Sequence, residues 1–147
     1  MSEKEPTQIP TATASAQSQP QGDTVFSLLG GESRVRALVD RFYDLMDLEP
    51  RYQALRAVHG SDLGSARQKL FWFLCGWLGG PNHYIERFGH PRLRARHMPF
   101  KIGLTERDQW LACMDQAMAE VGVDGALRAK LNDAFFGTAD WMRNTPG

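Results

Sequence analysis

One histidine of this chain lies in a segment that is unusually rich in arginine. Residues 89–103 read GHPRLRARHMPFKIG, which places His97 close behind three arginines: Arg92, Arg94 and Arg96. Pro91 and Pro99 leave room between them for at most about two helical turns. A helix this short needs a reason to be ordered. Imidazole suits a metal and guanidinium groups suit acids, so the segment predicts an anionic, metal-containing ligand.

The sequence argues against other common kinds of site. His83, His90 and His97 are seven residues apart, which on one helix would be about 10 Å per step and too far to share a zinc ion. The sequence contains neither a G-x-S-x-G motif nor a P-loop. The two cysteines, Cys75 and Cys113, are far apart and are interpreted as small buried hydrophobic residues.

The composition excludes several classes of protein. The 17 basic residues balance 17 acidic ones, whereas nucleic-acid and membrane-surface proteins usually carry a basic excess. No run of 18 apolar residues is present, so no membrane span is predicted. The N-terminus has no apolar signal core, and two cysteines make no disulfide framework. We therefore expect a cytoplasmic protein with reduced thiols.

Residue spacing divides the chain into a polar extension and a helical domain. Residues 1–22 are rich in Ser, Thr, Gln and Pro and are predicted to be disordered, which leaves residues 23–147 as one domain. Four stretches carry apolar residues at intervals of three and four, as on the buried face of a helix: residues 32–46, 63–78, 104–121 and 124–142. Because no alternating strand pattern occurs, the predicted fold class is all-α.

The combined motifs resemble group II of the truncated haemoglobins. Residues 77–110 read WLGGPNHYIERFGHPRLRARHMPFKIGLTERDQW. The matching pieces are the Gly-Gly-Pro stop, the Gly-His-Pro-Arg-Leu-Arg run, His97 with Pro99-Phe100 behind it, and the Glu-Arg-Asp-x-Trp helix start. The resemblance covers about residues 24 to 142. It implies a truncated globin fold, a two-over-two helical sandwich around haem b.

The resemblance also implies how the haem is held. The family's proximal iron ligand falls on His97, in agreement with the expectation from the residues alone. The second ring nitrogen of such a ligand needs an acceptor, for which we expect a backbone carbonyl. Arg96, next to the ligand, is the first partner expected for the haem propionates. Lys69, Tyr84 and Phe100 are further cofactor-binding residues by family analogy.

On the other side of the iron, the family pattern implies three hydrogen-bonding residues. They are Tyr43, His59 and Trp110, each of which carries a donor proton. Ala66 stands where a carrier globin has a distal histidine, and its small side chain would leave a side opening. The remaining residues expected to line this distal pocket are apolar: Phe42, Leu70, Phe73 and Leu74.

A polar distal pocket favours tight O2 binding and redox or detoxification chemistry with O2, nitric oxide or peroxide. Nitric oxide dioxygenase and peroxidase-like activities are the candidate reactions. The alternative is a non-catalytic O2 store or a haem-based sensor, in which Tyr43 or His59 reaches the iron when no external ligand is bound. A haem-free helical interaction domain is the third hypothesis. Without a flavin or NAD motif, turnover would need a separate reductase, and the sequence allows a monomer or a homodimer.

Overall fold

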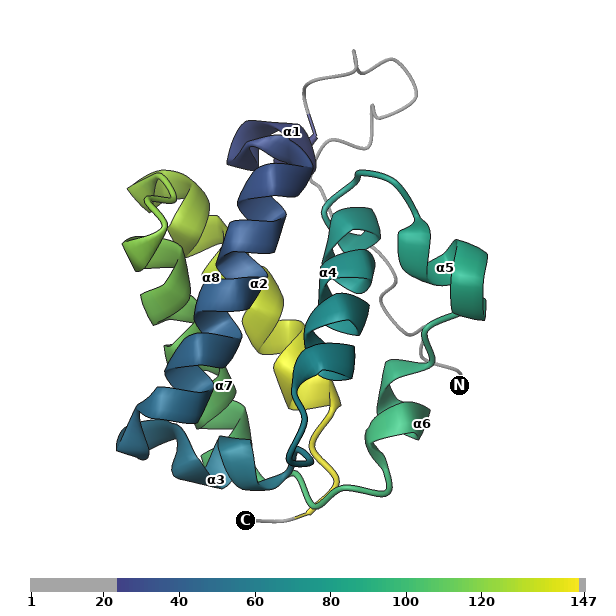
Figure 1. Ribbon diagram of the computed structural model, residues 1–147, viewed down its shortest axis with the longest axis vertical. Coiled ribbons are helices and arrows are strands. Elements are labelled where there is room, and N and C mark those ends of the chain that lie inside the picture. The colour runs from purple at the N-terminus through teal and green to yellow at the C-terminus, as the bar shows by residue number, and fades with distance from the viewer. Residues whose placement is uncertain (1–23, 146–147) are drawn as a thin grey trace.

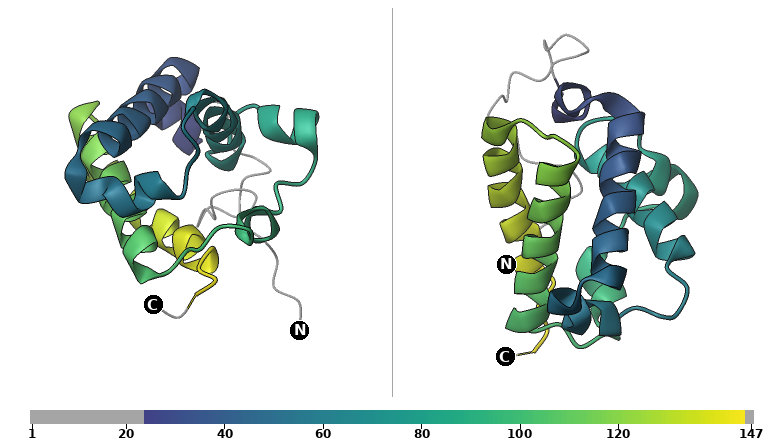
Figure 2. Two further views of the ribbon diagram at one scale, coloured as in Figure 1. Left: turned by 60° about the horizontal axis from the view of Figure 1, so that its bottom comes forward. Right: turned by 60° about the vertical axis from the view of Figure 1, so that its left-hand side comes forward.

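Four long helices, arranged as two pairs, form the body of the protein (Figures 1 and 2). The computed structural model describes residues 24–145. Helix α2 (Gly31–Leu48) packs beside α4 (Gly64–Trp77), and α7 (Leu104–Glu120) packs beside α8 (Gly125–Trp141). Helix α2 also packs against α7, which joins the two pairs. The predicted all-α class and the two-over-two sandwich are therefore confirmed.

Shorter helices connect the long ones. They are α1 (Val25–Leu29), the 3-10 helix η2 (Pro50–Tyr52), α3 (Gln53–Ala57), α5 (His83–Phe88) and α6 (Leu93–His97). Helices α1 and α5 are too short to show an apolar period, so the spacing did not identify them. Local capping stabilises α1, because the Thr24 hydroxyl accepts a hydrogen bond from the Ser27 amide at 3.0 Å.

Acidic residues lie at the starts of two long helices. The predicted stretch 63–78 corresponds to α4, which begins one residue later, at Gly64. Asp62 lies just before this helix, and its Oδ1 accepts a hydrogen bond from the Gly64 amide at 2.9 Å. Helix α7 begins at Leu104, where the Glu106 carboxylate accepts from the Gly103 amide at 2.8 Å. Both helices thus use the acidic residue that marks their start.

The apolar stripes form one core between the two pairs of helices. On α2 the buried residues are Val35, Leu38, Val39, Phe42, Tyr43, Leu45 and Met46. Cys75 and Cys113 are buried and free, as predicted. Burial raises the pKa of each thiol to about 12, so both stay protonated. The Cys113 thiol donates a hydrogen bond to the Phe42 carbonyl at 3.3 Å and so ties α7 to α2.

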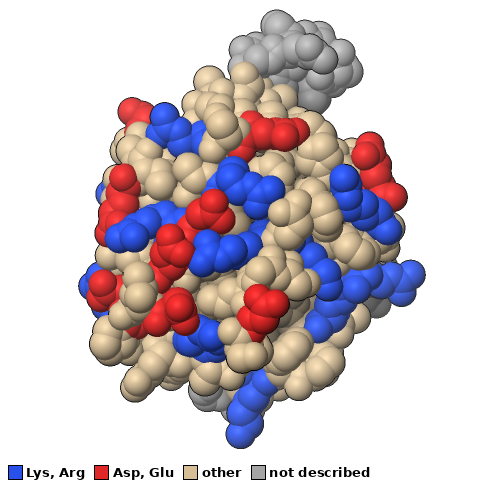
Figure 3. Space-filling view, in the orientation of Figure 1, with Lys and Arg blue, Asp and Glu red and all other residues tan. Residues whose placement is uncertain are grey.

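The surface over α2 and α4 carries interspersed charges (Figure 3). Arg67 of α4 pairs with Asp40 and Asp44 of α2 at 3.2 and 2.6 Å. Between residues 24 and 145, no helix combines the length and the apolar character needed to cross a bilayer. The extension predicted for residues 1–22 lies outside the described part of the chain.

Candidate functional site

The arginine-rich segment forms α6, a helix of five residues that ends at His97. Buried Pro91 and Leu93 anchor its start. Between them Arg92 has a left-handed backbone with φ of 48°, a conformation that non-glycine residues adopt only where the surroundings require it. The predicted limit of two turns is confirmed, and the helix is short enough to need support from outside itself.

The side chain of His97 is set in one tautomer. Its Nδ1 lies 2.6 Å from the carbonyl oxygen of Leu93, four residues earlier. A carbonyl can only accept, so Nδ1 carries the proton, and in the neutral ring Nε2 then holds the lone pair. His97 is half-buried, and its Nε2 makes no hydrogen bond within residues 24–145. This is the form in which imidazole binds iron, and the carbonyl partner is the one expected from the sequence.

The residues expected to hold the propionates lie on α4, α5 and α6. Arg96 is exposed, donates through Nε to the Pro91 carbonyl at 2.8 Å, and places its guanidinium 5.8 Å from the Tyr84 ring. Tyr84 of α5 is buried. Lys69 of α4 is exposed, with Nζ 5.6 Å from the centre of the Phe88 ring. Arg96 and Tyr84 therefore lie together, while Lys69 lies beside the end of α5.

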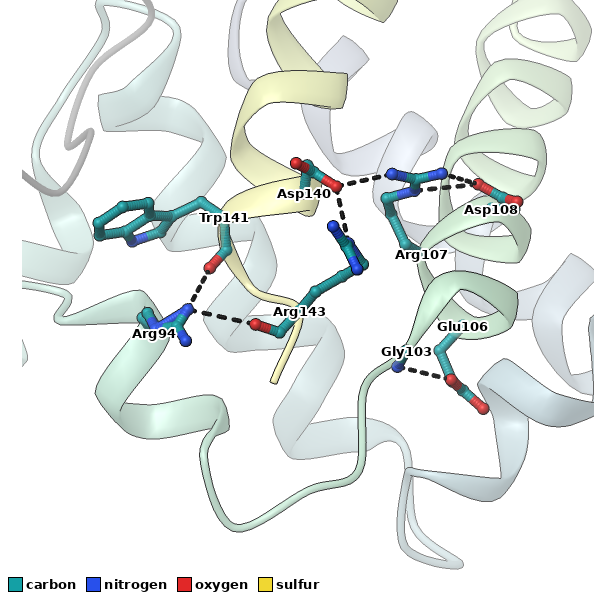
Figure 4. Close-up of polar contacts among 8 residues, drawn as sticks. All are labelled: Arg94, Gly103, Glu106, Arg107, Asp108, Asp140, Trp141 and Arg143. Carbon is teal, nitrogen blue, oxygen red and sulfur yellow. Dashed lines mark hydrogen bonds and ion pairs between the residues drawn. The ribbon is translucent and has the colours of Figure 1, made fainter. Parts of the chain in front are cut away.

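The sequence suggests that all three arginines bind acid groups of a ligand, but Arg94 binds backbone carbonyl groups of this chain instead. Its guanidinium donates to the carbonyl oxygens of Trp141 and Arg143, at the end of α8 and just beyond it, at 3.1 and 3.2 Å (Figure 4). Sequence patterns do not reveal this role, because the partners are backbone atoms 47 and 49 residues away. Arg94 is thus a structural link between α6 and the C-terminal end of α8.

The three predicted distal residues lie in one aromatic cluster. The rings of Tyr43 and His59 meet edge to face with centres 5.9 Å apart. Phe42 bridges the cluster, with its ring centre 5.0 Å from Tyr43 and 5.4 Å from Trp110. Trp110 packs on Phe135 of α8 at 5.2 Å. Residues from α2, α7 and the turn after α3 are therefore brought together.

Tyr43 is a buried phenol with an unused hydroxyl. The residue is 5% exposed, and its hydroxyl has no hydrogen-bond partner within residues 24–145. Burial raises the pKa of Tyr43 well above its usual range, and the Arg67 guanidinium, 5.8 Å from the ring, only partly offsets this. Tyr43 therefore remains a protonated donor at every physiological pH. The fully buried polar side-chain atoms without a partner in the described residues are Trp77 Nε1 and Trp141 Nε1, and the Tyr43 oxygen is not among them. The unpaired Tyr43 hydroxyl therefore keeps some accessible surface, which a ligand could approach.

His59 is neutral, and its tautomer matches that of His97. Nδ1 lies 3.0 Å from the Leu55 carbonyl, again four residues earlier, so Nε2 carries the lone pair. Burial lowers the pKa of His59; the Leu55 hydrogen bond raises it, and Arg56 and His97 lower it further. The donor proton assigned to this imidazole from the sequence is thus already used by Leu55. In its neutral form His59 offers a ligand an acceptor.

The apolar residues predicted to line the distal pocket fall into two groups. Phe42 and Leu74 are completely buried and belong to the core. Ala66, Leu70 and Phe73 are half-buried along α4. Only the second group presents surface that a ligand could contact. The sequence could not separate the two groups, because both follow the same helical spacing.

These residues fit a haem group. His97 supplies one imidazole whose Nε2 is not engaged within the described residues, Arg96 is adjacent to it in the chain, and Lys69 lies 5.6 Å from the Phe88 ring. Of the eight large hydrophobic side chains exposed within residues 24–145, five lie between positions 85 and 104: Ile85, Phe88, Met98, Phe100 and Leu104. Such apolar surface beside an imidazole suits a flat, mainly apolar macrocycle with acidic edges.

Comparison with known proteins gives a consistent result. The family model of the bacterial-like globins matches residues 24–144. The group 2 truncated haemoglobin YjbI of Bacillus subtilis is 42% identical over 114 residues, which are 78% of this chain and 84% of that protein.

Solved structures show the same likeness. The group II 2-on-2 haemoglobin of Agrobacterium tumefaciens superposes with a TM-score of 0.82 at 40% identity, covering 86% of this chain and 98% of that one. The truncated oxygen-avid haemoglobin of Bacillus subtilis gives a TM-score of 0.76 at 39% identity, covering 83% and 100%. The haem-free alternative is thereby set aside. The chain belongs to the bacterial-like globin family as a group II truncated haemoglobin, with haem as its cofactor.

Proposed function

We propose that this globin binds O2 on the Tyr43 side of its haem and holds it tightly enough for redox or detoxification chemistry. The observation that carries the proposal is the hydroxyl of the buried residue Tyr43, which stays protonated, has no partner within the described residues and is not fully enclosed. The related truncated haemoglobin of Bacillus subtilis, which is oxygen-avid, supports it. A store would have to release O2 readily, whereas tight retention suits O2 consumption with nitric oxide or peroxide.

Each residue of the site has a proposed part. When bound, haem supplies the iron at which O2 and similar small ligands bind. His97 offers Nε2 to that iron while Leu93 holds its Nδ1 proton. Arg96, Lys69 and Tyr84 would hold the propionates, and Phe100 would supply an apolar contact. On the distal side, Tyr43 and the Trp110 indole donate hydrogen bonds to O2, and each contributes about 0.5–1.5 kcal/mol.

The test is the rate at which O2 leaves the reduced protein. Carbon monoxide displacement in a stopped-flow instrument should show slow O2 release, and absorption spectra of the ferric, ferrous and O2-bound protein should identify each state. Fast release from the wild-type protein would contradict the proposed function. Nitric oxide or peroxide is then added to the O2-bound protein to distinguish dioxygenase from peroxidase-like chemistry.

One observation favours a switch as the second candidate function. His59 presents a neutral Nε2 lone pair, the same electronic form that His97 presents. An imidazole in this form can itself bind iron when no external ligand is present. A ferric spectrum of the low-spin, internally ligated type that disappears in His59→Phe would support a ligand-dependent sensor. A high-spin spectrum in the wild-type protein would favour the open, catalytic site.

The His59 tautomer predicts how O2 release depends on pH. Since burial lowers the pKa of His59, the ring stays neutral above about pH 6.5, its ordinary value. There Nε2 cannot donate to O2. Below the lowered pKa the imidazolium gains a donor at Nε2, so O2 release should become slower by up to about tenfold. Groups that act on this titration are Arg56, His97 and the Leu55 carbonyl.

The measurement is the O2 dissociation rate between pH 5 and 8 for the wild-type protein and His59→Phe. The variant should give a flat profile over the same range. A profile of the same shape in both proteins would assign the pH dependence to another group and contradict the role of His59.

We also propose that the electron donor is anionic and approaches the face of α5 and α6. Ion pairs with carboxylates hold many arginines elsewhere on the described surface, as in Arg41 with Glu120. Within residues 24–145, none joins the cations between positions 87 and 101, which are Arg87, Arg92, Arg94, Arg96 and Lys101. In Figure 3 blue side chains gather over this part of the molecule. An unbalanced positive field speeds the approach of an anion.

Two reductants that share one redox ring test this. Reduced flavin mononucleotide carries a phosphate and reduced riboflavin does not. At low ionic strength the phosphate-bearing flavin should reduce the ferric protein several-fold faster, and salt should remove the difference. Arg92→Gln should reduce the advantage, whereas Arg128→Gln, which loses a pair with Asp115 on α7, should not. Equal rates for both flavins at low salt would contradict the proposal.

A further inference from the structure

The residues that follow α8 are bonded to the segment that carries His97. Asn144 donates through its side-chain amide to the carbonyl oxygens of His97 and Phe100 at 3.2 and 2.7 Å. Its Oδ1 accepts from the Ile102 amide at 2.9 Å, and its own backbone amide donates to the Ile102 carbonyl at 2.8 Å. Both the amide group and the oxygen of one side chain are thus used to hold the turn between α6 and α7.

A second link joins the same two segments one turn before His97. Arg94 of α6 donates to the carbonyl oxygens of Trp141, the last residue of α8, and of Arg143, two residues beyond it (Figure 4). A cation at this position also complements the negative end of the helix dipole. The segment that follows α8 therefore holds α6 at two places: at Arg94, three residues before His97, and through Asn144 at His97 itself and Phe100.

The C-terminal end of α8 is in turn tied to α7. Asp140 accepts from Arg143 at 2.8 Å and from Arg107 at 2.6 Å, and Arg107 also pairs with Asp108 (Figure 4). Arg107 lies one turn before Trp110 on α7. The end of α8 is thus a fixed support, and not a free tail, for the bonds that reach α6.

We propose that Arg94 and Asn144 are positioning residues for His97. The Leu93 carbonyl sets the direction of the imidazole relative to α6, but a helix of five residues does not set its own place in the protein. The bonds from residues 141–144 set the place of α6, and so of Nε2, relative to α7 and α8. The proposal rests on the proposed role of His97 as the iron ligand. It assigns to the segment that follows α8 a part in holding haem.

Asn144→Ala and Asn144→Asp test it in the haem-loaded protein. Alanine removes every side-chain bond, whereas aspartate can still accept from Ile102 but cannot donate to His97 or Phe100. Both variants should lose haem to excess apomyoglobin about tenfold faster than the wild type, which corresponds to about 1.4 kcal/mol. Both should also broaden or shift the iron–histidine stretching band in the resonance Raman spectrum of the ferrous protein. Arg94→Gln should change the same two quantities in the same direction.

Asn132→Ala and Arg128→Gln are the matched controls. Asn132 and Arg128 both lie on α8 and both bind Asp115, far along the helix from residue 141. Unchanged haem loss and an unchanged band in both Asn144 variants would overturn the proposal. So would equal changes in the controls, because these would indicate general loosening of α8. Failure of His97 as the ligand is distinguishable, since the band would then persist in His97→Gly.

Discussion

Replacing His97 with glycine is expected to abolish the iron–histidine stretching band of the ferrous protein and to weaken haem retention by more than about 100-fold. The magnitude follows from the position of the residue, because even groups behind a metal ligand change metal affinity by about 10- to 100-fold. Within residues 24–145, only one ring nitrogen of His97 is engaged, at 2.6 Å from the Leu93 carbonyl. Nε2 is the nitrogen expected to bind the iron, and the substitution removes it.

Added imidazole provides the second half of this test. It should enter the space left by the side chain and restore a five-coordinate ferrous spectrum, though without the orientation that Leu93 imposes. His83→Gly is the control, because His83 is also half-buried but its Nε2 is already engaged by the Glu32 carboxylate at 2.8 Å. Wild-type haem retention in His97→Gly, or equal loss in His83→Gly, would contradict the assignment of the iron ligand.

Much of the fold follows from the sequence, because the long helices bury one face each. A stripe with intervals of three and four residues repeats several times in α2, α4, α7 and α8, so it stands out from chance. In α1 and α5 the helix ends before a second repeat. Those helices are held by contacts that the local sequence does not encode, such as the bond from the Phe26 amide to the Leu78 carbonyl at 2.9 Å.

The sequence suggests which residues form the candidate site, but not which hydrogen bonds their side chains make. The family resemblance in the sequence suggests His97, Tyr43 and Trp110, and the structure adds what surrounds each of them. The donor or acceptor character of His59 depends on one carbonyl, that of Leu55, whose direction only the folded chain defines. Arg94 shows the same limit. Its type and its place in an arginine run suggest an anion partner, yet backbone carbonyls at the end of α8 use its guanidinium.

Tyr43→Phe is expected to make O2 leave the reduced protein up to about tenfold faster, since it removes one hydrogen bond of about 0.5–1.5 kcal/mol. Adding Trp110→Phe, which removes the indole donor, should extend the effect to about 100-fold if the two bonds are independent. Carbon monoxide displacement measures both. Because the Tyr43 hydroxyl has no partner within the described residues, its loss should cost the ligand-free protein little stability.

Tyr52→Phe separates the effect on O2 release from the effect on stability, because it removes the hydroxyl of another buried tyrosine. The Tyr52 hydroxyl donates to Gln116 at 2.6 Å, and the residue is as buried as Tyr43. Its loss should lower the free energy of unfolding by about 0.5–1.5 kcal/mol and leave O2 release unchanged. The opposite pattern for Tyr43, fast O2 release with near-wild-type stability, would mean that its hydroxyl serves the ligand. If Tyr43→Phe destabilised the protein and left O2 release unchanged, the hydroxyl would be part of the core, and the proposed distal site would be wrong.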